Sequence, residues 1–396
     1  MPNLQAKAHP SGQVTTLGLY CHVPFCASTC DFCAFYQEKP RRGDIDRYLA
    51  GMEQEFLTRL PEPVRADTVF WGGGTPGLLP ASDLLRLGQA LLDRLSAHPA
   101  EWTVEMAPST VKADKLAALA TLGVTRISLG VQSFNPATLD ALGRQHTLKQ
   151  IEQAWTLIRG QGWRNVNLDL IFGIPDQTEA DWLRDLDAAL ALAPEHISTY
   201  CLTFEEDTAL YLKLSGGKVK RDPEQEARFF EITPPRLASG GYQQYEISNY
   251  ARSGHACIHN INTWRMTRWL GFGPSAATQN TTYRFTNVPN LDQWLAGLEN
   301  GRPARVDVTP LNDALLAADA LIFGLRMNDG VDLSILMDRF PDAPWSSLQP
   351  LWSRLENEGY LIPFTGRLQL TPAGRILADQ IGVAILEAWP EPGEPS

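Results

Sequence analysis

The segment CHVPFCASTCDFCAFY, residues 21–36, holds four of the six cysteines of the 396-residue chain. Three of them, Cys26, Cys30 and Cys33, are spaced C-x3-C-x2-C. They follow residues 16–25, an apolar stretch ending in proline and phenylalanine, which predicts a strand that runs into a loop. Three thiols in one loop are compatible with a disulfide framework, a zinc site or a centre that uses only three sulfurs.

Downstream of the cysteines, strand and helix patterns alternate with short connections. Strands are predicted at residues 66–76, 102–108, 124–134, 165–175 and 196–204, and helices at residues 44–60, 82–95, 112–123, 151–162 and 179–192. This order predicts a parallel α/β sheet. Barrels of this class build their sites at the carboxyl ends of the strands. The chemically unusual residues fall at those ends: Cys26 to Cys33, Gly72 to Thr75, Glu105, Gln132 and Asp169.

Composition and charge exclude several classes of protein. The formal net charge is −11, which repels phosphate backbones and argues against nucleic-acid binding. No apolar run approaches the ~20 residues that span a bilayer. The first fifteen residues lack the apolar centre of a secretory signal. We therefore expect a soluble cytoplasmic protein, in which a disulfide framework is the least favoured role for the cysteines.

The pattern changes after about residue 215. Residues 215–226 read as a polar connector and the following residues, to 251, as irregular structure, whereas residues 311–327 and 344–360 predict helices. Residues 361–379 predict a hairpin that leads into a helix, as in a winged-helix unit. The expected division is a mobile tail (1–15), a core domain (16–245), a connecting segment (246–305), a C-terminal helical domain (306–385) and a second tail (386–396).

The number of nearby ligands bears on the kind of metal site. Structural zinc normally takes four ligands, and the nearest fourth candidates here are Cys21 and His22. These two are neighbours on the predicted strand, so one of them must point away from the loop. Cys201 and Cys257 are expected to be buried as small apolar side chains. Three thiolates would leave one iron of a 4Fe–4S cluster open to a further ligand.

This cysteine motif after a first strand resembles the hallmark of the radical S-adenosylmethionine superfamily. The resemblance implies a partial parallel barrel and a 4Fe–4S cluster on Cys26, Cys30 and Cys33. It also implies that the remaining iron chelates the amino and carboxyl groups of S-adenosylmethionine. The segment WGGGTP, residues 71–76, resembles the glycine loop of the superfamily. There Gly73, Gly74 and Thr75 would let backbone approach the methionine part of the cofactor and offer N–H donors.

Later motifs narrow the resemblance, which runs from about residue 17 to about residue 379. Residues 125–147 and 165–178 look like the coproporphyrinogen-oxidase-like branch, which includes the oxygen-independent porphyrin oxidase and the HemW heme chaperones. The residues that the resemblance assigns to S-adenosylmethionine are Tyr20, Phe32, Glu105, Gln132, Arg144 and Asp169. The resemblance leaves a second S-adenosylmethionine open. Structural roles also remain open: Arg144 on a helix surface, and Gln132 or Asp169 as partners of loop backbone.

Two features separate the oxidase from the chaperones. The oxidase has a fourth cysteine two residues after the third, and this chain has Phe35 there. Residues 257–276 resemble the chaperone signature H-N-x-x-Y-W followed by G-F-G-P, with His259 and Trp264 in place. An exposed His259 could ligate heme iron while aromatic side chains cover the macrocycle. The chain departs from the family at Thr263, where the signature has tyrosine, and at Ala107, where relatives have asparagine.

The interpretation that follows is a heme chaperone with a 4Fe–4S cluster and S-adenosylmethionine, which delivers heme to a client protein. The competing interpretation is an enzyme, either an oxygen-independent coproporphyrinogen decarboxylase or a related methyltransferase. Phe35 and the segment 259–264 favour the chaperone. No catalytic residue is assigned.

Overall fold

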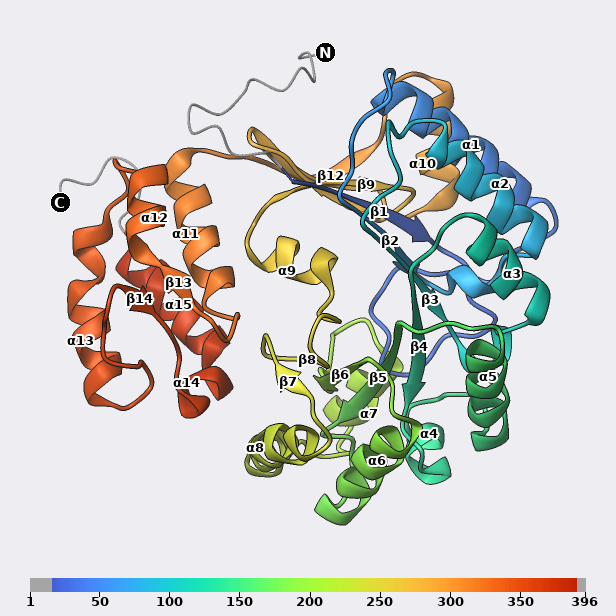
Figure 1. Cartoon of the computed structure of the whole chain (residues 1–396). Coiled ribbons are helices and arrows are strands. Elements are labelled where there is room, and N and C mark those ends of the chain that lie inside the picture. The colour runs from blue at the N-terminus through green and yellow to red at the C-terminus, as the bar shows by residue number, and fades with distance from the viewer. Residues whose placement is uncertain (1–15, 390–396) are drawn as a thin grey trace.

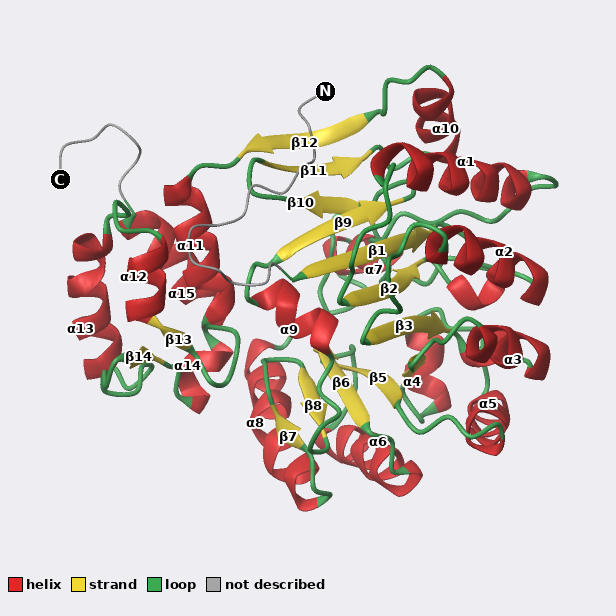
Figure 2. Cartoon of the chain, turned by 45° about the horizontal axis from the view of Figure 1, so that its top comes forward, coloured by secondary structure: helices red, strands yellow, loops and turns green. Residues whose placement is uncertain are grey.

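The computed structural model describes residues 16–389, and a twelve-stranded sheet lies at its centre (Figures 1 and 2). The strand order is β12-β11-β10-β9-β1-β2-β3-β4-β5-β6-β8-β7. The parallel strands are β1 (Leu17–Val23), β2 (Thr68–Gly73), β3 (Glu101–Met106), β4 (Arg126–Gln132), β5 (Val166–Phe172), β6 (His196–Cys201) and β9 (Arg268–Phe272). Neighbours along the chain are neighbours in the sheet from β1 to β6, so the predicted partial barrel is confirmed.

Helices follow the strands and cover the outer side of the sheet, as Figure 1 shows. They are α1 (Asp44–Arg59), α2 (Ala81–Leu92), α3 (Ala113–Thr121), α4 (Pro136–Ala141), α5 (Leu148–Gly160) and α6 (Glu179–Leu192), with short 3-10 turns at Pro76–Leu78 and Pro108–Thr110. Capping boxes at Thr147 and Thr178 start α5 and α6, because each hydroxyl accepts a helix N–H that would otherwise be unpaired.

The two faces of the sheet differ in chemistry. Alternate side chains of a strand point to opposite faces, and those on the outer face, such as Leu19 and Val69, are fully buried in the main core under the helices. The inner face is polar, and the register of β4 and β5 sets Ser128 beside Asn167, with Asp169 further along the same strand. Parallel sheets covered on both faces are normally apolar on both. The polar inner face therefore indicates a site.

The segment expected to connect two units, residues 246–305, instead extends the sheet. It supplies β8 (Asn249–Ala251), β9, β10 (Ala277–Gln279) and β11 (Tyr283–Asn287), and β12 (Arg305–Pro310) follows; β7 (Gln243–Gln244) pairs with β8. Helices α9 (Ile258–Trp264) and α10 (Leu291–Glu299) lie in the same segment. These strands are short and interrupted by glycine and proline, so their sequence pattern is weak.

The expectation of irregular structure after residue 226 is wrong. Helix α8 runs from Pro223 to Ser239, after the short helix α7 (Ala209–Ser215), and contains Pro234 and Pro235. Adjacent prolines normally break a helix because they lack N–H donors. Here the Thr233 hydroxyl donates to the Phe229 carbonyl at 2.6 Å and accepts from the Trp182 indole at 2.8 Å. Packing on α6 therefore outweighs the local signal.

The C-terminal unit is helical, as predicted. It comprises α11 (Asp313–Gly324), α12 (Leu333–Arg339), a 3-10 turn (Trp345–Leu348), α13 (Gln349–Asn357), α14 (Pro372–Ile376) and α15 (Ala378–Ala388). Its buried apolar residues form a cluster separate from the main core. The predicted hairpin is reduced to one bridge, Leu361 with Leu370, and β14 (Arg367–Leu368) pairs with β13 (Val331–Asp332) instead.

The ends of the chain are described only in part. Residues 1–15, the expected first tail, and residues 390–396 lie outside the described range. Residues 386–388 of the expected second tail belong to α15. No helix within residues 16–389 is both long enough and apolar enough to cross a bilayer.

Candidate cofactor site

A cavity of about 1380 Å³ opens at the carboxyl ends of the parallel strands. All three cysteines of the motif line it, together with Phe32 and Arg144. The remaining predicted residues on its wall are Gly73, Gly74, Thr75, Glu105, Gln132 and Asp169. The tertiary structure thus brings together eleven of the fourteen predicted site residues. The other three, Tyr20, His259 and Trp264, are not part of the wall.

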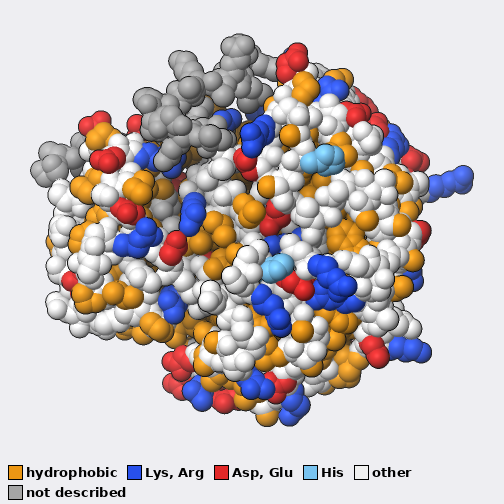
Figure 3. All heavy atoms as spheres, viewed as in Figure 1, with side chains coloured by type: hydrophobic (Ala, Val, Ile, Leu, Met, Phe, Trp, Pro, Cys, Tyr) orange, Lys and Arg blue, Asp and Glu red, His pale blue; other side chains and the backbone are white. Residues whose placement is uncertain are grey.

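The cavity also reaches the C-terminal unit, which contributes Arg326 and residues 375–380 to its wall. In the space-filling view, basic side chains lie along the boundary between that unit and the barrel, beside hydrophobic ones (Figure 3). Both units therefore shape the cavity.

The cysteine loop is anchored from several sides. Cys26 Sγ is hydrogen-bonded to Thr75 Oγ1 at 3.3 Å, and the Arg144 guanidinium donates to Cys30 Sγ at 3.3 Å. Asp31, next to Cys30, donates its N–H to the Leu142 carbonyl at 3.1 Å and accepts from Lys213 Nζ at 2.6 Å. These contacts hold the cysteine loop at the cavity wall.

The donor set fits a 4Fe–4S cluster. Burial raises the pKa of the Cys26 and Cys33 thiols above its usual value, so an iron that binds there has to displace the protons. Within residues 16–389, no three His, Cys, Asp or Glu side chains converge closely enough for a single metal ion. A cluster does not need such convergence, because each thiolate binds its own iron. The cationic Arg144 beside Cys30 offsets part of the negative charge of such a cluster.

The three cysteines outside the motif differ in burial and in their neighbours. Cys21 points to the outer face and is fully buried, and its neighbour His22 is hydrogen-bonded through Nε2 to the Tyr36 carbonyl at 2.9 Å. Cys257 is buried with its Sγ 3.3 Å from Glu101 Oε1. Cys201 is not the core residue expected from the sequence, since it is partly exposed and lines the cavity.

The glycine loop does not offer the N–H donors expected at Gly74 and Thr75. The N–H of Gly74 donates to the Val23 carbonyl and that of Thr75 to the Phe25 carbonyl, both at 2.8 Å. A Cβ at Gly74 would lie 2.7 Å from the Phe25 carbonyl oxygen, one residue before Cys26. The glycine therefore permits close packing of the loop on the cysteine segment, and valine at this position would disturb the cluster as well as S-adenosylmethionine.

Two partly buried carboxyl groups, Glu105 and Asp169, lie on the cavity wall. Burial, and secondarily the nearby Asp169, raise the pKa of Glu105 to about 8. Burial also raises the pKa of Asp169, although Ser128 Oγ donates to it at 3.0 Å and Asn167 Nδ2 at 2.8 Å. Two carboxyl groups with disfavoured charge create a site that prefers a cationic ligand.

Gln132 and Arg144 occupy special positions at the end of β4. Gln132 has φ of 68°, in a register shift between Gly130 and Gln132. Non-glycine residues adopt this conformation at a cost and are often found at functional sites. Arg144 donates to the Gly130 carbonyl at 3.0 Å, and its Nε is buried without a partner among the described residues. Arg144 is therefore a wall residue and not a helix-surface residue.

Tyr20 lies on the inner face of β1, outside the cavity wall. Its hydroxyl is hydrogen-bonded to His22 Nδ1 at 3.2 Å, and its ring stacks on Phe70 with centroids 6.3 Å apart. Phe70 in turn lies 5.2 Å from the ring of His259. Packed aromatic rings thus connect Tyr20 with helix α9.

His259 is buried, so the expectation of an exposed imidazole is wrong. Its Nδ1 is hydrogen-bonded to Thr68 Oγ1 at 2.9 Å, and burial lowers its pKa to about 4. Helix α9 begins near the amino ends of β1 and β2 (Figure 2), and the ring centre of its last residue, Trp264, lies 4.8 Å from the guanidinium carbon of Arg326 on the cavity wall. Trp264, at the end of the helix, packs on Phe323 with ring centroids 6.1 Å apart.

A buried ion pair, which the sequence-based analysis missed, holds α9 in place. Glu101 accepts from the N–H groups of Ile258 at 3.1 Å and His259 at 2.9 Å. Arg126 donates to Glu101 Oε2 and to the His255 carbonyl, both at 3.0 Å. The available signal was a pair of opposite charges near the starts of two consecutive predicted strands, residues 102–108 and 124–134.

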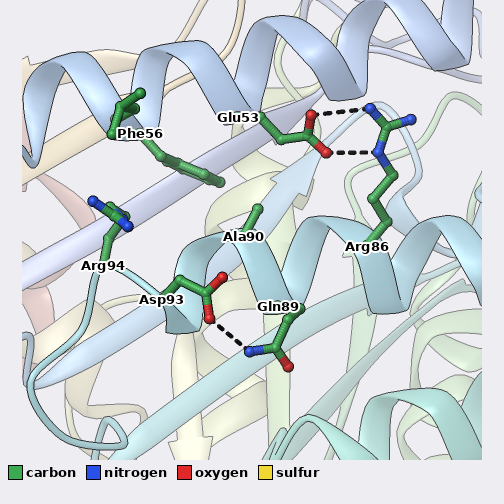
Figure 4. A pocket seen from close by; sticks show the side chains of 8 residues that line it. Glu53, Phe56, Arg86, Gln89, Ala90, Asp93 and Arg94 are labelled. Atoms are coloured by element: carbon green, nitrogen blue, oxygen red, sulfur yellow. Dashed lines mark hydrogen bonds and ion pairs between the residues drawn. The ribbon is translucent and has the colours of Figure 1, made fainter.

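A second hollow, of about 480 Å³, lies between α1 and α2 (Figure 4). Arg86 donates to Glu53 at 2.6 and 3.0 Å, and Gln89 donates to Asp93 at 2.8 Å. These polar groups satisfy one another, and none of the predicted site residues lies there. The hollow is a seam between two helices.

Comparison with known proteins supports the interpretation of this cavity as a cofactor site. The profile of the Radical SAM superfamily matches residues 20–189, and that of the HemN C-terminal domain matches residues 314–377. The heme chaperone HemW of Bacillus subtilis is 31% identical over 374 residues, which cover 93% of this chain and 98% of that protein. HemW of Synechocystis is 36% identical over 325 residues, covering 79% and 78%.

Among solved structures, coproporphyrinogen III oxidase (HemN) from Escherichia coli superimposes with a TM-score of 0.81. The match covers 94% of this chain and 90% of that one at 24% identity, a likeness that shows the fold. The chain is a radical S-adenosylmethionine protein of the HemN-like branch. Within that branch it belongs to the HemW family. The superfamily implies a 4Fe–4S cluster and S-adenosylmethionine.

Proposed function

We propose that the protein is a heme chaperone, which binds heme and delivers it to a client protein. The observation that carries the proposal is the identity to HemW heme chaperones over nearly the whole chain. Phe35 adds support, because a side chain that is 72% exposed at the cavity rim replaces the fourth cysteine of the oxidase motif. We also propose a cytoplasmic location and a C-terminal domain that follows β12, a few residues after the expected start at residue 306.

In this proposal Cys26, Cys30 and Cys33 hold the 4Fe–4S cluster. When bound, the cluster supplies an open iron that chelates the amino and carboxyl groups of S-adenosylmethionine. Glu105 and Asp169 favour the cationic parts of that ligand, since both carboxyl groups lie partly buried on the wall and their charged forms are disfavoured without it. We assign the remaining contacts to the other predicted residues on the wall: Phe32, Gly73, Gly74, Thr75, Gln132 and Arg144. Tyr20, which lies outside the wall, is assigned a supporting role on the inner face of β1.

The raised pKa of Glu105 leads to a pH dependence of cofactor binding. Its pKa of about 8 keeps the carboxyl group mostly protonated at pH 7 in the ligand-free protein. A sulfonium cation nearby favours the carboxylate, so binding releases this proton and strengthens as the pH rises toward 8. At pH 7 the wild type should release about one proton more per S-adenosylmethionine than Glu105→Gln. Anaerobic titration calorimetry in two buffers of different ionisation enthalpy measures the difference.

The exposed Glu179, which lies outside the cavity, provides the matched control, and Glu179→Gln should release as many protons as the wild type. Equal proton release by the wild type and Glu105→Gln would show that Glu105 does not lose its proton when S-adenosylmethionine binds.

For heme we propose helix α9, with Nε2 of His259 as the axial ligand and Trp264 as apolar cover. The low pKa of His259 keeps its imidazole neutral at pH 7, the state that binds iron. Since Nδ1 is engaged by Thr68, Nε2 is the ring nitrogen left for iron. The burial of His259 implies that α9 shifts away from the sheet when heme enters.

Hemin titration of the anaerobically reconstituted protein tests this proposal. His259→Ala should weaken hemin binding at least about tenfold through loss of the axial nitrogen, and Trp264→Ala should weaken it through loss of apolar cover. Thr263→Tyr should strengthen it, because it restores the family's aromatic residue. His98→Ala, which removes an exposed imidazole on another segment, is the control. Unchanged binding by His259→Ala, together with anaerobic conversion of coproporphyrinogen to a vinyl product by the wild type, would favour the oxidase.

A further inference from the structure

The side of the cavity formed by the C-terminal unit carries two arginines, Arg326 and Arg375. A third arginine on the wall, Arg221, is already neutralised, because it donates to both carboxylate oxygens of Glu226 at 2.8 and 2.7 Å. The first two are less completely paired. Arg144, the fourth arginine of the wall, donates to Cys30 Sγ and to the Gly130 carbonyl at the cysteine end of the cavity. At the other end, Arg326 and Arg375 are the guanidinium groups available to a further ligand.

Arg375 has no carboxylate partner within ion-pair distance in residues 16–389. One Nη donates weakly to the Leu370 carbonyl at 3.5 Å, and Nε is buried without any partner in the described part of the chain. Partial burial of an unpaired guanidinium is costly unless something compensates the charge. The cavity is where a compensating anion can enter.

Arg326 lines the same cavity and also contacts helix α9. Its guanidinium carbon lies 4.8 Å from the centre of the Trp264 ring, and its Nε is buried without a partner in the described residues. Its ion pair is with Asp379, a side chain that is 84% exposed and therefore well screened by solvent. Arg326 thus faces the cavity and supports the helix proposed for heme.

The size of the cavity leaves room for a second ligand beside S-adenosylmethionine. Its volume of about 1380 Å³ exceeds the roughly 300–1,000 Å³ of common small-molecule sites. The wall also carries apolar side chains, among them Phe204, Phe230, Ile247 and Leu377. A ligand suited to this end has a broad apolar body and carboxylate groups at its edge.

We infer that Arg326 and Arg375 form a dicarboxylate-binding end of the cavity, which holds the propionate groups of the heme. The inference rests on the proposed function and adds the residues that recognise the periphery of the ligand. Guanidinium groups suit this role because they donate two parallel hydrogen bonds to a carboxylate. Because both arginines belong to the C-terminal unit, the bound ligand bridges that unit and the barrel.

The test compares hemin with hemin dimethyl ester, which has the same iron and macrocycle but no free carboxylates. Both are titrated, in the same detergent-containing buffer, into the full-length reconstituted protein. We expect the wild type to bind hemin at least about tenfold more tightly than the ester, and Arg375→Gln to remove most of that preference. Arg326→Gln should act in the same direction, and Arg375→Lys should retain part of the preference.

Arg354→Gln is the matched control, since Arg354 is an exposed arginine on the same unit and outside the cavity. Equal affinity of the wild type for hemin and its ester, or an Arg375→Gln protein that keeps the full preference, would overturn the inference and leave the chaperone proposal standing. If Arg375→Gln bound one S-adenosylmethionine fewer than the wild type and still bound hemin normally, that result would also overturn the inference. A wild type that binds neither compound would overturn the proposed function and, with it, this inference.

Discussion

A Cys30→Ala protein should fail to hold a 4Fe–4S cluster after anaerobic reconstitution. Cys30 lies between the other two motif cysteines in one loop, and its Sγ accepts from the Arg144 guanidinium. Three thiolates already leave one iron of the cluster without a protein ligand. With only two thiolates a second iron would also lack one, so the cluster would not be retained. Iron and sulfide analysis should give about four irons per chain for the wild type and close to none for the variant.

Cys201→Ala is the matched control, because Cys201 lines the same cavity and yet stands outside the motif. We expect it to keep the full iron content. Cys21→Ala should keep it as well, since the Cys21 side chain is buried on the opposite face of β1. Loss of the cluster in either control would show that the site uses four cysteines and not three.

The second large effect concerns stability. Glu101→Leu should lower the free energy of unfolding of the cluster-free protein by about 3–5 kcal/mol. The substitution leaves Arg126 buried without its carboxylate, although its Nε and Nη1 already lack partners among the described residues. It also removes the acceptor for the first N–H groups of α9. Urea unfolding measures the change.

The double variant Glu101→Leu with Arg126→Met should recover much of this loss, because removing both charges removes the uncompensated one. Glu179→Ala, which breaks an exposed ion pair with Arg228, should cost less than about 1 kcal/mol. If Glu101→Leu cost no more than Glu179→Ala, the pair Glu101–Arg126 would not be what holds α9.

The local pattern of the sequence was sufficient for the first six strands and for helices α1, α2, α3, α5 and α6, whereas the short α4 was not predicted. Apolar runs, glycine loops and capping residues such as Thr147 and Thr178 act over a few neighbouring residues, so they can be read directly. The same reasoning failed at Pro234 and Pro235, where α8 persists through contacts with α6. Contacts between distant segments can outweigh local propensity, and the local pattern does not show where they form.

The sequence predicted which residues line the cofactor site better than it predicted the contacts that those residues make. The three cysteines, Glu105 and Asp169 all face one cavity, as their places at strand ends indicated. The sequence did not reveal that the Gly74 N–H is already used within the loop. A residue's type shows what it can donate or accept, whereas its actual partners depend on the backbone around it.

The amino-acid sequence by itself determined the class of this protein: the cysteine spacing, the alternation of strands and helices, and Phe35 in place of a fourth cysteine. Only the tertiary structure decided that His259 is buried against Thr68 and that Arg375 shares a cavity with Cys30. The physical reason is that spacing along the chain is covalent, whereas exposure and shared cavities arise from the packing of segments that are far apart in sequence. Cys30 and Arg375 line one cavity because the C-terminal unit packs against the barrel.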